Sequence, residues 1–327
     1  MYKSKEAAIK NLKSGKKFGS KLFDLMRDNK EVVTVAVTAN GMNLQNAALS
    51  MRNDFEVVHA AVVQNPMALE FASVELQNNF TIVKTAVVKN GEALFDASTE
   101  LRDNFHLVKL AVSNFGDALE WASPKLRNNV DIAEIAVANS SLAFRFVSPS
   151  LLNNLELAKI AVTRNSNALL FASPKLRDNF GLVKIAVQRA GESLRFASHD
   201  LLNNFDLAKI AVNSMFDQLC TPRFLSNALR DNRQLAELIL QNDSDALRHL
   251  STRLKSDLDI VYAAVLRNRN SIQYAATNIR SECEGKDPKV VLEKLIHERD
   301  CLEFAQRLQT TLPEKPEPEK RPKSLKI

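Results

Sequence analysis

The side chains best suited to metal chemistry lie near the C-terminal end of the sequence. His297 and Cys301 are four residues apart, and Cys283 precedes them. An imidazole and a thiolate one helical turn apart could contribute to a zinc site, because zinc prefers nitrogen and sulfur ligands. The three candidates lack the paired spacing of a zinc motif, so we predict neither a metal nor another cofactor.

The five histidines offer no recognisable catalytic arrangement. They fall in different parts of the sequence, and none has a serine, cysteine or carboxylate beside it in the spacing of a nucleophile motif. Only eight glycines occur in 327 residues, and they do not cluster as a phosphate-binding loop requires. We therefore expect a protein that is not an enzyme, although distant segments could still bring catalytic groups together in space.

Lysines recur in register and could bind a row of phosphates, as in a nucleic acid. The lysines of this column are Lys84, Lys109, Lys159, Lys184 and Lys209. Two of them follow an acidic residue, Glu156 or Asp206, by three positions, which favours local ion pairs. The aromatic residues that should accompany such a column lie elsewhere in the pattern. Nucleic-acid binding is therefore the alternative hypothesis.

The positive charge of the chain is concentrated at its N-terminus. The net charge is +6, and residues 1–27 alone contain eight Lys or Arg against Glu6 and Asp24. We interpret this segment as a basic N-terminal cap and not as a secretory signal, because no hydrophobic run follows the charges. Three cysteines fit a reducing compartment. The apolar runs are too short for a membrane span, so we expect a cytosolic protein.

The lysine column belongs to a repeat of 25 residues. We number each repeat from the residue that follows an Asn/Asp pair, called position 0: Lys30, Phe55, Phe80, Phe105, Val130, Leu155, Phe180, Phe205, Arg233 and Leu258. Positions 0, +2, +3, +5, +6 and +7 are mostly apolar, which predicts a helix buried over most of its surface. Ala at +13, Leu at +14, an aromatic residue at +16 and Ala at +17 predict a second, shorter helix whose aromatic column packs in the core.

These repeats predict an all-α fold, because units this small must stack to bury their apolar faces. We expect a right-handed α-solenoid of about ten 25-residue two-helix repeats over residues 28–280, with an irregular joint at 213–228. A helical cap follows at 281–310, in which residues 302–305 repeat the Leu, aromatic and Ala positions. Residues 311–327 alternate proline with charge and should form a disordered tail.

The sequence also predicts where the long helices begin and end. Several Asn or Asp residues precede an acidic residue by three positions, which is the spacing of a capping box. They are Asp28, Asn53, Asn153 and Asn203. At the other end, Asn40-Gly41 and Asn90-Gly91 predict a C-cap in the left-handed conformation.

The pattern LRDNFxxVKxAVxxNGxALxFAS, as at 101–123 and 176–198, resembles the DUF4116 repeat family over about residues 25–280. The resemblance implies a helical tandem repeat, and it implies no activity. Such repeats occur in protists and in effectors of intracellular bacteria. The tail, with Glu314, Glu317 and Glu319 before Leu325 and Ile327, is similar to the C-terminal signal of type IV-secreted effectors. We therefore expect a bacterial effector that is secreted into the host cytoplasm.

A long solenoid most often serves to bind another protein. The outward positions +12 and +15 of the short helix carry arginine and apolar side chains, the usual anchors of interfaces. They include Phe95, Leu142, Arg145, Leu170, Arg195 and Arg248. In the irregular joint, Phe216, Arg223 and Phe224 either repack a junction between two arrays or form a binding loop. We expect a monomeric, non-catalytic scaffold for a protein partner, which could be a host protein.

Overall fold

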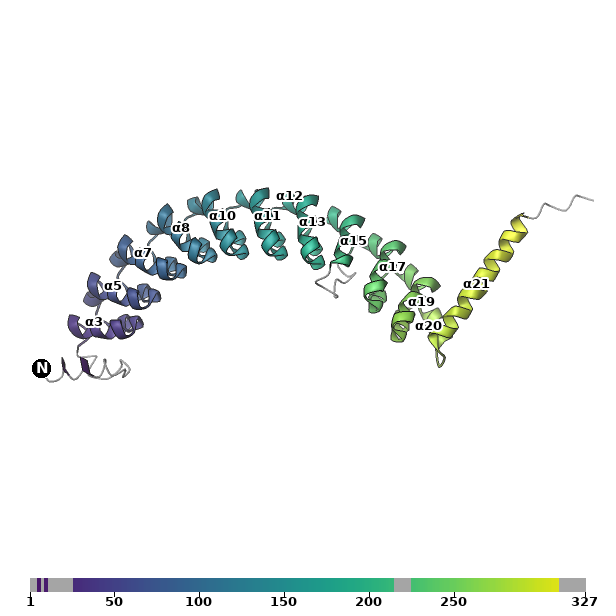
Figure 1. Cartoon of the computed structure of the whole chain (residues 1–327), viewed down its shortest axis with the longest axis horizontal. Coiled ribbons are helices and arrows are strands. Elements are labelled where there is room, and N and C mark those ends of the chain that lie inside the picture. Colours follow the sequence, from purple (N-terminus) through teal and green to yellow (C-terminus); the bar gives the residue numbers. More distant parts are fainter. Residues whose placement is uncertain (1–4, 7–8, 11–25, 215–224, 312–327) are drawn as a thin grey trace, which may run out of the picture. The chain divides into compact units, whose positions relative to one another are not determined.

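The structure is a computed structural model that describes residues 5–6, 9–10, 26–214 and 225–311. They belong to two compact units that divide between Asp217 and Gln218, inside the segment 213–228. Every regular element of the described residues is helical, so the chain is an all-α solenoid of tandem 25-residue repeats (Figure 1). Most of the basic N-terminal cap lies outside the described residues, as do Phe216, Arg223, Phe224 and residues 312–327 of the tail.

Each repeat of unit 1 begins with a long α-helix. These helices are α3 (Lys30–Ala39), α5 (Phe55–Gln64), α7 (Phe80–Lys89), α8 (Phe105–Asn114), α10 (Val130–Asn139), α11 (Leu155–Arg164), α13 (Phe180–Arg189) and α15 (Phe205–Asn213). Positions +2, +3, +6 and +7 are buried, as Leu107, Val108, Ala111 and Val112 are in α8. At 100° per residue these four positions span one continuous arc of the helix.

The expectation that positions 0 and +5 also lie in the core is wrong in part. Phe80, at position 0, is 42% exposed, and Ile135, at +5, is half-buried. These two positions lie at the two edges of the buried arc, where the neighbouring repeats cover a side chain only on one side. Position 0 therefore lies next to the solvent-facing position +4.

The predicted second helix is a 3₁₀-helix of six residues. These helices are η1 (Gly41–Asn46), η2 (Pro66–Phe71), η3 (Gly91–Asp96), η5 (Gly116–Trp121), η6 (Ser141–Phe146), η8 (Ser166–Phe171) and η9 (Gly191–Phe196). Side chains three residues apart are eclipsed in a 3₁₀-helix. Positions +14 and +17 therefore form one buried row, as Leu119 and Ala122 do, while +12 and +15 form the outer row.

A third, one-turn segment follows where the sequence predicted only a turn. These segments are α4 (Leu49–Arg52), α6 (Val74–Gln77), η4 (Leu101–Asp103), α9 (Pro124–Arg127), η7 (Leu151–Asn153), α12 (Pro174–Arg177) and α14 (His199–Leu202). In α9, Pro124 is the first helical residue, where proline fits best, and the Ser123 hydroxyl accepts a hydrogen bond from Leu126 N. The Ser-Pro pair thus ends one helix and begins the next.

Hydrogen bonds join each repeat to the next at these serines. Ser173 Oγ donates to Asn153 Oδ1 at 2.7 Å, and Ser173 N donates to the Leu152 carbonyl at 3.0 Å. The same serine-to-Asn/Asp contact, always twenty residues apart, recurs along the chain: Ser73–Asn53, Ser98–Asn78, Ser123–Asp103, Ser148–Asn128, Ser198–Asp178 and, in unit 2, Ser251–Asp231. The first residue of each Asn/Asp pair therefore links neighbouring repeats.

The second residue of the pair is the N-cap of the long helix. Asn79 Oδ1 accepts hydrogen bonds from Thr81 N and Ile82 N, at 3.1 and 3.2 Å. Only this residue has the extended backbone that lets its side chain reach the first turn. The prediction of the first residue as the cap is wrong by one position for Asp28, Asn53, Asn153 and Asn203.

The predicted left-handed C-caps are also wrong. Asn40 and Asn90 are extended, and their side chains cap the following 3₁₀-helices; among the described residues only Gly285 has a positive φ. Gly41 and Gly91 have a different role, which concerns the contact with the next repeat. A Cβ at either position would lie 2.3 or 2.4 Å from a carbonyl oxygen of the next repeat, so these glycines permit close stacking.

Unit 2 contains two further repeats and a C-terminal helix. Its elements are α16 (Asn227–Arg230), α17 (Arg233–Asn242), η11 (Ser244–His249), α18 (Thr252–Lys255), α19 (Leu258–Arg267), η12 (Arg269–Tyr274), α20 (Thr277–Cys283) and α21 (Pro288–Thr311). The first half of α21 packs on α19 through Leu292, which is fully buried. Leu302 and Phe304 are exposed, so these two residues do not pack as the Leu and aromatic positions of a repeat, which their sequence suggests.

Candidate functional site

The long helices of unit 1 present a face formed by positions 0 and +4. Phe80 is partly exposed, and the Lys84 ammonium lies 6.0 Å from the centre of its ring. Phe55 stacks on His59 in the same relation, with 5.8 Å between ring centres. Aromatic residues therefore do lie beside the basic column, which contradicts the expectation that they are confined to another face.

The lysines of the column differ in their surroundings. Lys84, Lys109, Lys184 and Lys209 are exposed. Lys159 is half-exposed and forms the predicted ion pair with Glu156 at 2.8 Å, whereas no ion pair joins Asp206 to Lys209, both of them described. Glu134 occupies the same position in α10 and interrupts the column.

The outer rows of the 3₁₀-helices form the second candidate surface, which we call the short-helix face. It consists of positions +12, +15 and +16 of the 3₁₀-helices in unit 1. All the predicted partner-binding residues on these rows are exposed: Phe95, Leu142, Arg145, Leu170, Arg195 and, in unit 2, Arg248. The aromatic residues at +16 are half-buried, so the expectation of a fully packed aromatic column is wrong in part.

In the later repeats of unit 1 the short-helix face combines arginine with aromatic rings. The guanidinium carbons of Arg145 and Arg195 lie 4.4 and 4.6 Å from the ring centres of Phe146 and Phe196. Such stacking holds the planar guanidinium in a defined orientation on the surface. Leu170 lies at the same position between them in the repeat order and is 49% exposed.

In the earlier repeats the same face, together with Phe115 at position +10, combines aromatic rings with carboxylates. Phe95 and Phe115 both contact Trp121, with ring centres 5.8 and 6.1 Å apart. Three successive 3₁₀-helices of this region, η2, η3 and η5, carry five carboxylates: Glu70, Glu92, Asp96, Asp117 and Glu120. We call these eight residues the acidic–aromatic patch.

Asp96 is the most perturbed group of the patch. Burial, together with the negative charges of Glu70 and Glu92, raises the pKa of its carboxyl to about 6 against the partial compensation of Arg102. Its Oδ2 atom is buried and accepts no hydrogen bond, and the Nε of Arg102 likewise has no acceptor within the part of the chain that is described. The carboxylate therefore carries a desolvation cost that the charge of Arg102 offsets only in part.

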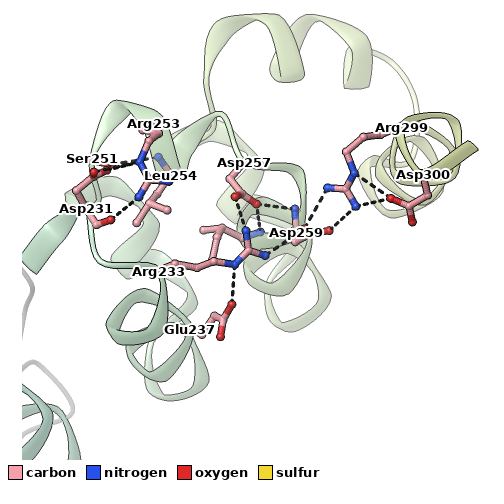
Figure 2. Close-up of polar contacts among 11 residues, drawn as sticks. Asp231, Arg233, Glu237, Ser251, Arg253, Leu254, Asp257, Asp259, Arg299 and Asp300 are labelled. Atoms are coloured by element: carbon pink, nitrogen blue, oxygen red, sulfur yellow. Dashed lines mark hydrogen bonds and ion pairs between the residues drawn. The ribbon is translucent and has the colours of Figure 1, made fainter. Parts of the chain in front are cut away.

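Unit 2 has a different arrangement, an alternating row of acidic and basic groups (Figure 2). Arg233, at position 0, binds Asp257 at 2.6 Å and Asp259 at 3.1 Å, and Asp259 also binds Arg299 of α21. The hydrogen bond to Arg299 is the largest cause that holds the pKa of Asp259 below its usual value. This row links α21 to the last repeats through the ion pair between Asp259 and Arg299.

The candidate zinc ligands do not form a site. Cys301 Sγ and His297 Nε2 lie 3.7 Å apart on the exposed side of α21, whereas Cys283 is buried, where desolvation raises the pKa of its thiol. Across residues 26–214 and 225–311, no group of three His, Cys, Asp or Glu side chains could hold a metal ion. Within the same residues, no helix is both long and apolar enough to cross a membrane.

The acidic–aromatic patch was not identified from the sequence. Its signal was present, because Asp96 stands where the neighbouring repeats have an aromatic residue, and Phe115 stands where most repeats have a capping Asn. Both changes are departures from the repeat pattern, and they become informative only when the stacking brings them to one face.

A protein-family model described as "Domain of unknown function (DUF4116)" matches the chain repeatedly. The matched ranges are 29–77, 54–102, 79–127, 104–152, 129–177 and 232–280. Each match covers about two repeats, and together they include more than half of the chain. No curated protein and no solved structure matches.

Proposed function

The chain belongs to the DUF4116 family, and on this premise we propose that it is a monomeric, non-catalytic scaffold whose short-helix face binds another protein. The observation that carries the proposal is a contrast in residue types between the interior of the solenoid and the short-helix face. The buried positions repeat nearly the same residue types, whereas the outer row changes in every repeat. From η2 to η9 it reads Met67 and Glu70, Glu92 and Phe95, Asp117 and Glu120, Leu142 and Arg145, Asn167 and Leu170, Glu192 and Arg195.

This contrast is typical of solenoids that recognise proteins, in which a regular core displays a varied surface. Binding energy in protein interfaces is concentrated in exposed apolar side chains and in arginines. The short-helix face offers both, with Leu142, Leu170 and Phe95 as exposed apolar side chains and two arginines held in a defined orientation by stacking. A catalytic function has no comparable support.

A triple variant of the short-helix face tests the proposal. Leu142→Ala, Arg145→Ala and Leu170→Ala change exposed side chains, so the fold should persist. Proteins captured from a eukaryotic lysate by the native chain and by this variant are then compared by quantitative mass spectrometry. We expect a partner that the native chain captures and the triple variant loses.

A matched control is the triple variant Lys109→Ala, Val130→Ala and Lys184→Ala on the long-helix face, where all three side chains are also exposed. It should retain the partner. Loss of the partner by the control and retention by the short-helix variant would contradict the proposal.

Nucleic-acid binding is the second candidate, and one observation favours it. The exposed Phe80 and Phe180 lie four residues before Lys84 and Lys184, so ring faces accompany the basic column. Rings and ammonium groups together are what single-stranded nucleic acids bind. Tight binding of a single-stranded oligonucleotide that falls steeply with salt and is lost when the five lysines are neutralised would support this function.

We also propose that the protein is a bacterial effector that acts on a host protein. The support is the resemblance of the tail, with Glu314, Glu317 and Glu319, to a type IV secretion signal. Removal of residues 313–327 should abolish translocation of a reporter fusion and leave the melting temperature unchanged. Normal translocation of the shortened chain would remove this support.

A further inference from the structure

The acidic–aromatic patch contains two local changes that weaken the repeat. In most repeats an Asn or Asp side chain caps the 3₁₀-helix, as Asn90 caps η3. Phe115 replaces that residue before η5, where the side-chain cap is lost, as it is before η6 and η9. Of these three helices, η5 alone has an aromatic ring in that place, which is 38% exposed and stacks on Trp121. Loss of such a cap normally costs stability.

The second change lies in the preceding repeat. Asp96 occupies position +16, where η2, η5 and η6 have Phe71, Trp121 and Phe146. A half-buried carboxylate with an unpartnered oxygen replaces an aromatic ring. Both departures from the local rules fall on adjacent 3₁₀-helices, which pack against each other, and such departures tend to coincide with functional sites.

We propose that the acidic–aromatic patch binds an arginine- or lysine-rich segment of the partner protein, an inference that rests on the proposed function. Phe95 is 57% exposed and lies, in the order of the repeats, between Glu70 and Glu120 at the same position +15. A cationic side chain over this ring would gain cation–π attraction and could bind a carboxylate on either side.

The charges of the patch exclude other occupants. None of its five carboxylates forms an ion pair with any basic side chain that the structure describes. A phosphate chain would be repelled by them, and a purely apolar segment would bury Asp96 further without offering its Oδ2 a donor. A guanidinium or an ammonium group can form cation–π contacts with the rings and ion pairs with the carboxylates.

Trp121 makes the experiment direct, because it is the only tryptophan of the chain. Its fluorescence is measured while the full-length protein is titrated with a nine-residue arginine peptide, a nine-residue lysine peptide or a nine-residue glutamate peptide. We expect saturable changes with the two basic peptides, weakened by salt, and none with the glutamate peptide. Phe95→Ala, an exposed change, should weaken binding about three- to thirty-fold.

Matched charge variants distinguish binding at a specific site from non-specific attraction between opposite charges. Glu92→Gln, Asp96→Asn and Glu120→Gln remove three charges from the patch. Asp131→Asn, Glu134→Gln and Asp206→Asn remove three from the long-helix face. The patch variant should weaken binding about tenfold or more, and the control about twofold or less.

Equal weakening by both triple variants, or an unchanged Trp121 signal at saturation, would overturn the inference. If the peptides bound only after removal of residues 1–25, the occupant would be the chain's own basic N-terminus, and a partner segment would be refuted. These failures leave the proposed function standing if Leu142, Arg145 and Leu170 are still needed to capture a protein.

Discussion

Replacement of Asp96 by asparagine should stabilise the protein at neutral pH and have no effect in acid. The folded protein raises the pKa of Asp96 from 3.8 to about 6, chiefly by burial, so folding favours the protonated form. Below about pH 4 both states are protonated and the stability difference vanishes. As the pH rises from about 4 to 6, the native chain loses stability, because the folded state must then ionise a desolvated carboxylate.

The size of the effect follows from the pKa shift. A shift of roughly two pKa units corresponds to about 3 kcal/mol at most, at about 1.4 kcal/mol per unit. Because the side chain is only half-buried, solvent screening reduces this to about 1 kcal/mol. The Asp96→Asn variant should therefore be more stable than the native chain by about 1 kcal/mol at neutral pH and equal to it in acid.

Urea unfolding followed by Trp121 fluorescence measures this difference, because Trp121 lies on the next 3₁₀-helix and reports on the same repeats. Asp131→Asn, a change of an exposed carboxylate on α10, is the control and should leave the pH profile unaltered. A native chain that is more stable than the Asp96→Asn variant at neutral pH would refute the reasoning, since Asp96 would then form a stabilising pair with Arg102.

Other substitutions test the stacking and the C-terminal helix. Gly116→Val should lower the free energy of unfolding by about 2 kcal/mol, because its Cβ would lie 2.4 Å from a carbonyl oxygen of the next repeat, whereas the exposed Gly181→Ala should not lower it. Ser193→Ala should raise the free energy of unfolding by about 1 kcal/mol, since the fully buried hydroxyl has no hydrogen-bond partner among the described residues; an equal or lower value would show that it has one. Arg299→Met should speed amide hydrogen exchange after residue 299, because α21 loses its contact with Asp259; unchanged exchange would contradict this role.

The repeat and its buried positions were predictable from the sequence. The 25-residue period follows from comparing the repeats along the sequence. The apolar spacing of Val83, Ala86 and Val87 depends on a single helix, so it can be read from one repeat. The helical class of the fold and the outward direction of positions +12 and +15 follow in the same way, and the exposed Leu142 and Arg145 confirm that direction.

The errors concern features that depend on the neighbouring repeat. Asn153 has the spacing of a cap, but its side chain bonds to Ser173 twenty residues later. Gly91 does not have a left-handed backbone. A Cβ at this position would collide with the next repeat, and this collision accounts for the glycine. The acidic–aromatic patch needs three stacked repeats, so periodicity within one repeat could not reveal it.

Site-specific photo-crosslinking tests the central claim, that the short-helix face binds a protein. A photoreactive phenylalanine analogue replaces either Leu170 on the short-helix face or Phe180 on the long-helix face, both exposed. After irradiation in a eukaryotic cell lysate, we expect a discrete protein adduct from position 170 and none from position 180. A discrete adduct from position 180 alone, or a nucleic-acid adduct there, would contradict the claim.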